Sequence, residues 1–132
     1  MEMSQRSASD AVATVESYAL ALTESRIDDL VALFTEDAEL RDPFDGPILR
    51  GRAALSEFFG QGAALVDRLS VSGPVRVTGD LMSAAAPMLA EVTMQGASID
   101  MDSVDVFFFD DAGLISAMHA FYGPTNVRPK AQ

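Results

Sequence analysis

Ser98-Ile-Asp-Met-Asp-Ser-Val-Asp-Val-Phe-Phe-Phe109 is the longest strand-like stretch of this chain, rich in β-branched and aromatic residues. Successive side chains of a strand point to opposite faces of a sheet, so this stretch has two rows of side chains. The turn residues Asp110-Asp-Ala-Gly113 follow it, and residues 114–122 are again strand-like. The two segments predict a β-hairpin.

The rest of the chain divides into a helical first half and a strand-rich second half. Apolar residues recur at helical spacing in the first half, for example Val12, Val15, Ala19 and Leu22. The segment 69–78 is broken by Gly73-Pro74, which indicates a bent or edge strand. Helices are expected at about 9–23, 28–34 and 52–61, and further strands at about 38–42, 69–78 and 87–94.

Helices followed by a run of strands are typical of the α+β class. We expect a cone-shaped fold in which three N-terminal helices pack on a curved antiparallel (mixed) β-sheet and enclose an apolar pocket. The chain has 132 residues, which fits a single domain over residues 1–132. Flexible tails are expected at about residues 1–8 and 128–132.

Composition limits the classes of function. The chain has 9 basic and 20 acidic residues and a net charge of −11, which disfavours nucleic acid and anionic membranes as partners. Without cysteine, and with His119 as its one histidine, it lacks a thiolate nucleophile and a typical zinc cluster. The N-terminal residues contain no apolar core of a signal peptide, so a cytoplasmic location is expected.

Asp105 is the most informative polar residue, because it interrupts an otherwise apolar row of the 98–109 strand. No basic residue occurs between Arg76 and Arg128 to pair with it. A buried carboxyl without a cation raises its pKa and stays protonated, and it can then donate a hydrogen bond. The alternative is that this row faces solvent and Val104, Val106 and Phe108 fill the core.

Two further polar residues stand out. Asp42 lies at a strand end, on the same strand face as Ala38 and Leu40. The alternative is that Asp42 only forms a turn before Pro43, with Arg41 as a possible partner. Tyr18 lies beside the apolar stripe of the first helix; alternatively, it only packs there with its hydroxyl in water. We interpret His119 as an ordinary strand residue. Five methionines are interpreted as flexible core filler: Met82, Met88, Met94, Met101 and Met118.

Several of these residues occur in motifs that resemble bacterial ketosteroid isomerase (steroid Δ-isomerase), within the nuclear transport factor 2-like and SnoaL-like fold family. The motifs are Tyr18-Ala-Leu-Ala-Leu22, Asp29-Leu-Val-Ala-Leu-Phe34, Asp37-Ala38, Arg41-Asp-Pro-Phe44 and Val104-Asp-Val-Phe107, with Gly113, Met118 and Tyr122 beyond them. The resemblance extends from about Val12 to Val127. The joint presence of Tyr18, Asp42 and Asp105 is its most specific feature.

The resemblance implies a catalytic role for these three residues. Asp42 would be the general base, moving a proton from the carbon next to a steroid carbonyl to a position two carbons away. Tyr18 and protonated Asp105 would hydrogen-bond the oxygen as it becomes a dienolate. Such an isomerase would act on a small apolar ketone, a Δ5-3-ketosteroid, and would need no cofactor and no metal.

The resemblance also implies further contacts and one departure. Phe59 stands where the family usually has a tyrosine that supports the catalytic tyrosine, which predicts a looser oxyanion hole. Relatives are homodimers that pack through the outer face of the sheet, and Val104, Val106 and Phe108 suit that surface. The positions expected to contact substrate are Leu22, Phe58, Phe59, Met88, Met101, Met118 and Tyr122.

Two other functions remain open from the residues. One is a SnoaL-type polyketide cyclase or another enolate-forming enzyme of the same fold. The other is a non-catalytic module that binds a steroid or another lipid. All three hypotheses require an apolar pocket, so the shape of the pocket does not distinguish them. They differ in the role of the base, Asp42.

Overall fold

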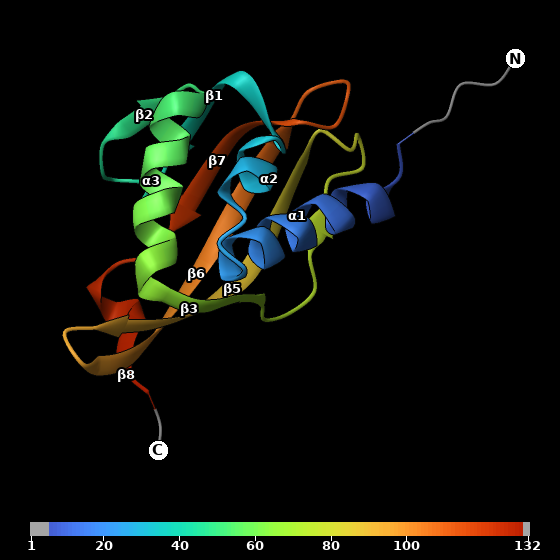
Figure 1. The fold of residues 1–132 in the computed structure, drawn as a ribbon. Helices are drawn as coiled ribbons and strands as arrows, with labels where there is room; N and C mark the ends of the chain where they lie inside the picture. The colour runs from blue at the N-terminus through green and yellow to red at the C-terminus, as the bar shows by residue number, and fades with distance from the viewer. Residues whose placement is uncertain (1–5, 131–132) are drawn as a thin grey trace, which may run out of the picture.

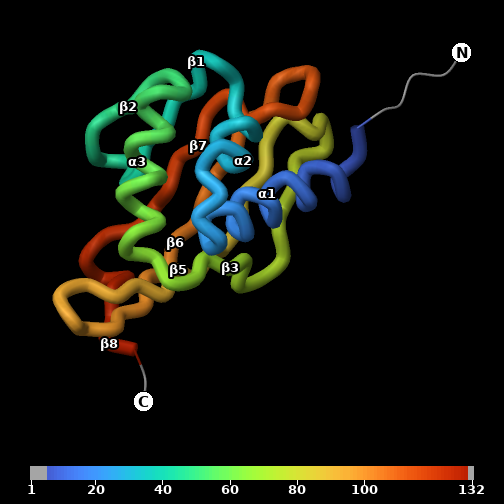
Figure 2. The backbone as a smooth tube through the Cα atoms, viewed as in Figure 1, coloured from blue at the N-terminus to red at the C-terminus, as the bar shows by residue number. Residues whose placement is uncertain are grey.

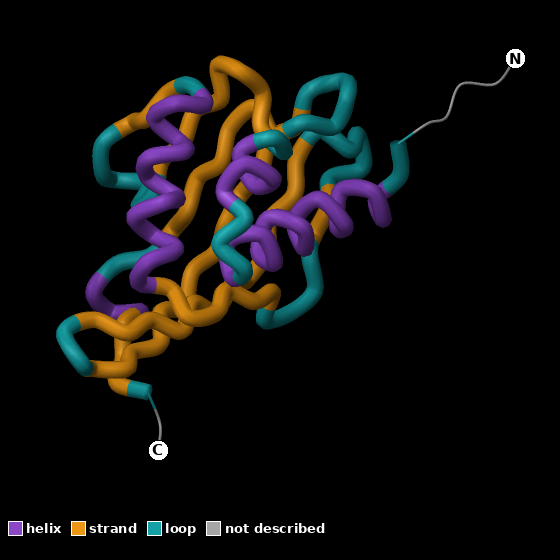
Figure 3. The backbone as a smooth tube through the Cα atoms, viewed as in Figure 1, coloured by secondary structure: helices purple, strands orange, loops and turns teal. Residues whose placement is uncertain are grey.

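The computed structural model describes residues 6–130 of the chain. Three helices lie on one face of a curved sheet (Figure 1). The same division into a helical and a strand layer is clear when the chain is coloured by secondary structure (Figure 3). The helices are α1 (Ala8–Thr23), α2 (Ile27–Val31) and α3 (Arg52–Leu65), with a short 3-10 helix η1 (Pro124–Asn126) near the C-terminus.

The sheet has eight strands, and its main path runs in the order β2-β1-β7-β6-β5-β3. Strands β1 and β7 are parallel, and all other pairs are antiparallel, so the sheet is mixed. The long β5 and β6 pair along their lengths behind the helices (Figure 2). The strands are β1 (Phe34–Arg41), β2 (Ile48–Arg50), β3 (Val66–Val71), β4 (Arg76–Val77), β5 (Ser83–Met94), β6 (Ala97–Phe109), β7 (Ile115–Phe121) and β8 (Val127–Pro129). The expected α+β class, with helices on one face of a curved mixed sheet, is confirmed.

Helix α1 begins at a capping box. The Ser7 hydroxyl accepts a hydrogen bond from the backbone N–H of Asp10, and the Asp10 carboxylate accepts one from the backbone N–H of Ser7 at 2.8 Å. These bonds satisfy two amides at the start of the helix. One stripe of α1, including Val15, Tyr18 and Leu22, is buried against the sheet. This stripe brings the Tyr18 side chain into the interior.

The second helix is shorter than its sequence pattern predicts. We expected it over about 28–34, but α2 ends at Val31 and Phe34 already begins β1. Phe34 is fully buried and pairs with Ile115 of β7. Sheet pairing and burial therefore override the helical spacing at this position. Helix α3, in contrast, runs four residues beyond its expected end at Gln61.

The ends of the domain are more ordered than expected. Ser7 and Ala8 belong to the cap and first turn of α1, and residues 127–129 form β8, which pairs with Ile99–Met101 of β6. Part of each tail expected at 1–8 and 128–132 therefore belongs to a regular element. Residues 1–5 and 131–132 lie outside the described part of the chain. None of the helices within residues 6–130 is long and apolar enough to cross a membrane.

The core lies between the helices and the concave face of the sheet. Its largest fully buried side chains include Phe34, Phe59 and Phe107. Two of the five methionines interpreted as core filler are exposed instead: Met82 just before β5, and Met94 at the end of β5.

Candidate active site

A pocket opens between the helices and one end of the sheet. It has a volume of about 160 Å³ and is lined by residues of α1, α3 and several strands. Most of its lining is apolar. The polar side chains in it include all three predicted catalytic residues, Tyr18, Asp42 and Asp105, together with Ser103 and Tyr122. The tertiary structure therefore brings together residues from distant parts of the chain, such as Tyr18 and Tyr122.

Tyr18 is held in place by three aromatic rings. Its ring meets those of Phe34, Phe59 and Phe107 edge to face, with centroids 6.4, 5.8 and 5.5 Å away. Its side chain is 2% exposed and faces the pocket, so the alternative with the hydroxyl in bulk water is wrong. Burial raises the pKa of Tyr18 well above its usual value, and the nearby charge of Asp105 adds to this. Tyr18 is therefore a neutral hydrogen-bond donor.

Asp105 lies in the middle of β6, opposite Ala86 of β5 and Ala120 of β7. It is 3% exposed, whereas Val104 and Phe108 on the other face of the strand are 45% and 37% exposed. The alternative orientation of this strand is therefore wrong. Burial raises the pKa of Asp105 to about 7, with a further rise from the charge of Asp42 and an opposing hydrogen bond from Ser103.

Asp42 follows the last residue of β1. The chain there is tied to β7, because the backbone N–H of Phe44 donates to the carbonyl of Ala120 at 2.8 Å. Burial raises the pKa of Asp42 to about 6. Arg41, a possible partner, turns away: its Nε donates to the carbonyl of Phe44 at 3.1 Å, and its guanidinium lies 3.8 Å from the centre of the Phe44 ring. The pair between Asp42 and Arg41 that the sequence allowed does not form.

Tyr122 reaches the pocket from the end of β7. Strands β1 and β7 are parallel, with Leu40 opposite Met118 and Arg41 opposite His119, so residues 42 and 122 emerge at the same end of the sheet. The hydroxyl of Tyr122 lies beside Asp42 in the pocket, and its influence lowers the pKa of that carboxyl against the larger effect of burial. Burial and the charge of Asp42 raise the pKa of Tyr122 itself. Tyr122 therefore keeps its phenolic proton beside Asp42.

A family model described as a SnoaL-like domain matches residues 15–118, a range that includes Tyr18, Asp42 and Asp105. This range covers well over half of the chain. The chain belongs to the SnoaL-like domain family.

Relatives of this SnoaL-like protein include enzymes. It is 33% identical over 96 residues to a steroid Delta-isomerase from Nocardioides simplex, an alignment that covers 72% of this chain and 75% of the relative. It also resembles a solved structure of SalBIII, described as an epoxide hydrolase/cyclase-like enzyme in pyran ring formation in the polyether salinomycin. That similarity has a TM-score of 0.86 at 27% identity and covers 92% of this chain and 97% of the other.

The apolar wall of the pocket in this SnoaL-like domain differs in part from expectation. Leu22, Phe58, Phe59, Met101 and Tyr122 line it. Met88 and Met118 do not: they are 1% and 0% exposed and belong to the core. The reason is that the pocket begins one inward-facing position further along each strand, at Ala90 of β5 and Ala120 of β7.

Ser103, two residues before Asp105 on β6, is a further polar residue of the pocket to which the sequence analysis assigned no role. Its Oγ donates to Oδ1 of Asp105 at 3.0 Å. The spacing of two residues on a strand was the signal, because it puts both side chains on one face. No spacing in the sequence predicted that Tyr122 would lie beside Asp42, because the two residues are far apart in the chain.

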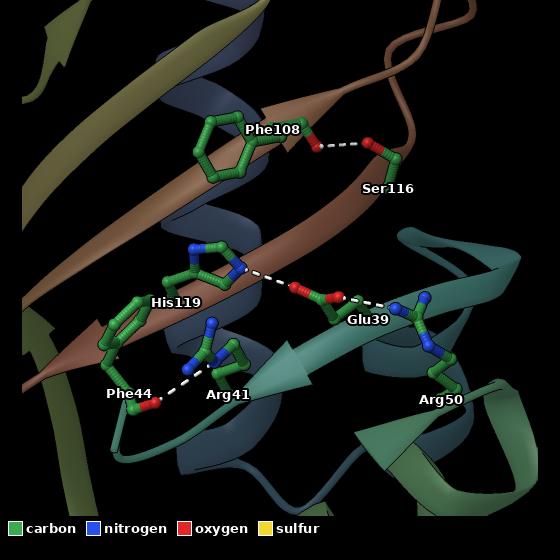
Figure 4. A network of polar contacts seen from close by, with 7 residues as sticks. All are labelled: Glu39, Arg41, Phe44, Arg50, Phe108, Ser116 and His119. Carbon is green, nitrogen blue, oxygen red and sulfur yellow. Dashed lines mark hydrogen bonds and ion pairs between the residues drawn. The ribbon is translucent and has the colours of Figure 1, made fainter. Parts of the chain in front are cut away.

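The opposite face of the sheet carries the one histidine of this SnoaL-like protein. His119 Nε2 lies 2.7 Å from Oε2 of Glu39, whose Oε1 accepts from Arg50 at 2.8 Å (Figure 4). The His119 hydrogen bond lowers the pKa of Glu39. His119 thus points away from the pocket, on the face that the helices leave open. Within residues 6–130, no three or more potential metal-binding side chains come together.

Proposed function

We propose that this protein is a steroid Δ-isomerase that converts a Δ5-3-ketosteroid to its Δ4 isomer. The observation that carries the proposal is the convergence of Tyr18, Asp42 and Asp105 in one apolar pocket. The SnoaL-like family and the steroid Delta-isomerase relative support it. The substrate would be a small apolar ketone, with its oxygen at the polar end of the pocket.

The mechanism we propose moves one proton within the substrate. Asp42, ionised, removes a proton from the carbon between the carbonyl and the C=C bond, and the electron pair moves onto the carbonyl oxygen to form a dienolate. Tyr18 and protonated Asp105 donate hydrogen bonds to that oxygen. Asp42 then returns the proton two carbons away, so the C=C bond becomes conjugated and the enzyme regains its starting state.

The electrostatics of the pocket suit this division of roles. A C–H bond next to a ketone is a weak acid, so its removal by a carboxylate needs strong stabilisation of the enolate oxygen. One preorganised donor typically contributes ~10²–10³ in rate and a positioned base ~10²–10⁴. The pKa of Asp42, about 6, lies below that of Asp105, about 7, so Asp42 loses its proton first.

A polyether or polyketide cyclase is the second candidate, and the similarity to the SalBIII structure favours it. The same pocket would then use one carboxyl as acid and the other as base on an oxygen nucleophile. A binding module without catalysis is the third reading. Because all three would bind apolar ligands, only turnover separates them.

The test is conversion of 5-androstene-3,17-dione by the purified full-length protein, followed through the absorbance of the conjugated enone. We expect turnover by the wild type and a loss of at least about 10²-fold in Asp42→Asn. Asp45→Asn, which removes a carboxyl from the neighbouring turn, is the matched control and should retain activity. Binding of the steroid with no change in absorbance would instead support the binding module.

We also propose that the outer face of the sheet pairs with a second copy of the chain. Val104, Phe108 and Phe121 are 45%, 37% and 44% exposed there. The charged side chains among them have partners within the chain: Glu39 contacts His119 and Arg50, and Arg41 donates to the carbonyl of Phe44. An apolar face whose charged side chains already have such partners suits packing against a second copy of the chain.

Sedimentation of the wild type and of Val104→Lys tests the dimer. A dimer that Val104→Lys converts to a monomer supports the proposal. Leu20→Lys on α1, an exposed position on the helical side of the sheet, should remain dimeric. A monomeric wild type at all concentrations would contradict it.

A further inference from the structure

Ser103 and Asp105 form a fixed pair on β6. They are two residues apart on one strand, and both side chains line the pocket. The backbone of this segment pairs with β5 at both positions, with Met88 opposite Ser103 and Ala86 opposite Asp105. The distance of 3.0 Å between Ser103 Oγ and Asp105 Oδ1 is therefore set by the sheet rather than by a loop.

This contact has a chemical consequence for a neutral carboxyl group. A protonated carboxyl carries one O–H donor and one acceptor oxygen, and a serine hydroxyl has a single proton to donate. When Ser103 donates to Oδ1, that oxygen is the acceptor and the acid proton resides on Oδ2. Without the hydroxyl, the last torsion of an aspartate is broad and either oxygen can hold the proton.

We propose that Ser103 is a positioning residue that selects the oxygen of Asp105 from which the proton is donated to the substrate. The inference rests on the proposed function, in which Asp105 donates to the dienolate oxygen. Ser103 itself touches Asp105 and not the reacting atoms. Its contribution is preorganisation, because a donor that already points at the developing charge needs no reorientation during the reaction.

Removing the hydroxyl has two effects of opposite sign. The hydrogen bond from Ser103 lowers the pKa of Asp105, so Ser103→Ala raises that pKa and keeps the carboxyl protonated to higher pH. It also frees the carboxyl to rotate, which weakens donation to the oxyanion. If Ser103 only tuned the acidity of Asp105, Ser103→Ala would raise the pKa and leave donation to the oxyanion unchanged. If Ser103 only supported the fold, the variant would not combine a higher pKa with weaker donation.

The experiment compares Ser103→Ala with two controls. Ser103→Thr keeps a hydroxyl at the same place, and Ser98→Ala removes one from an exposed position of the same strand. The Asp105 carboxyl is titrated by ¹³C NMR, kcat for 5-androstene-3,17-dione is measured against pH, and 2-naphthol serves as a probe whose hydroxyl mimics the dienol oxygen. Unfolding in urea confirms that each variant is folded.

For Ser103→Ala we expect the Asp105 titration and the alkaline limb of kcat to move up by about one pH unit. The plateau of kcat and the affinity for 2-naphthol should both fall roughly tenfold. Ser103→Thr should restore all of these values, and Ser98→Ala should change none of them.

An unchanged Asp105 titration in Ser103→Ala would overturn the inference. An upward titration with undiminished kcat and naphthol affinity would overturn it too, because acidity alone would then account for Ser103. Absence of steroid turnover in the wild type would contradict the proposed function, while the carboxyl titration and the naphthol affinity would still decide the role of Ser103.

Discussion

Asp42 and Asp105 enter one pocket from strands that are not neighbours in the sheet, because β7 lies between β1 and β6. Burial raises the pKa of each carboxyl, and the charge of Asp42 raises that of Asp105 further. Two side chains of the same type therefore titrate at different pH, about 6 for Asp42 and about 7 for Asp105. Their surroundings, and not their residue type, separate the two pKa values, as the proposed roles of base and donor require.

If the proposed isomerase activity holds, this order of pKa values predicts a narrow, bell-shaped dependence of kcat/KM on pH. Activity should fall below about pH 6 as Asp42 is protonated and above about pH 7 as Asp105 ionises. Asp105→Asn should lower the plateau and remove the alkaline limb, because an amide stays a neutral donor. The measurement is kcat/KM between about pH 5 and 9. A wild-type profile with no alkaline limb would count against Asp105 as the protonated donor.

Tyr122→Phe should make Asp42 a weaker acid. Loss of the hydroxyl removes the influence of Tyr122 that lowers the pKa of this carboxyl. A hydrogen bond to a charged group corresponds to about one pH unit, so the acidic limb of kcat/KM should move up by that amount. Tyr18→Phe, the same chemical change elsewhere in the pocket, should lower kcat without moving this limb. If both variants leave the limb in place, Tyr122 only contacts the ligand.

Phe59→Tyr should strengthen Tyr18 as a donor. The two rings meet edge to face at 5.8 Å, and Phe59 has no hydroxyl with which to support Tyr18. A hydroxyl placed there and donating to Tyr18 should raise kcat several-fold, by about the effect of one hydrogen bond. The gain should vanish in the double variant with Tyr18→Phe, because the new group acts only through Tyr18. An equal gain in both backgrounds would show that it acts by another route.

Asp105→Asn should stabilise the fold at high pH. The pKa of Asp105 is about 7 in the folded state and ~3.9 in an unfolded chain. The folded protein therefore keeps the Asp105 proton up to a higher pH than the unfolded chain does. Its contribution to stability is complete below about pH 4 and is lost as the pH rises to about 7. The variant escapes this loss, so its free energy of unfolding at pH 8 should exceed that of the wild type by roughly 1–4 kcal/mol.

Urea denaturation at about pH 4 and pH 8 measures this difference, which should be much smaller at the lower pH. Asp102→Asn is the matched control, because it removes a carboxyl from a half-exposed position of the same strand. It should show no such gain at pH 8. Equal stability of Asp105→Asn and the wild type at both pH values would mean that Asp105 is ionised at no cost in the folded protein.

Much of the site follows from local pattern. The two-residue period of 98–109 put Asp105 on the same face as Phe107, and the helical stripe of the first segment carried Tyr18 inward. The motifs around these residues also indicated the family. The local pattern did not predict the structure where strand pairing decided it. Phe34 was expected in a helix but begins β1, and residues 127–129 form the strand β8.

The sequence by itself determined which side chains share a face, because the periods of strands and helices are properties of the backbone. Only the tertiary structure decided which face is buried and what each inward side chain meets. The parallel pairing of β1 with β7 brought Tyr122 to Asp42, and the depth of the pocket left Met88 and Met118 in the core. Both depend on contacts between residues far apart in the chain, which no local period encodes.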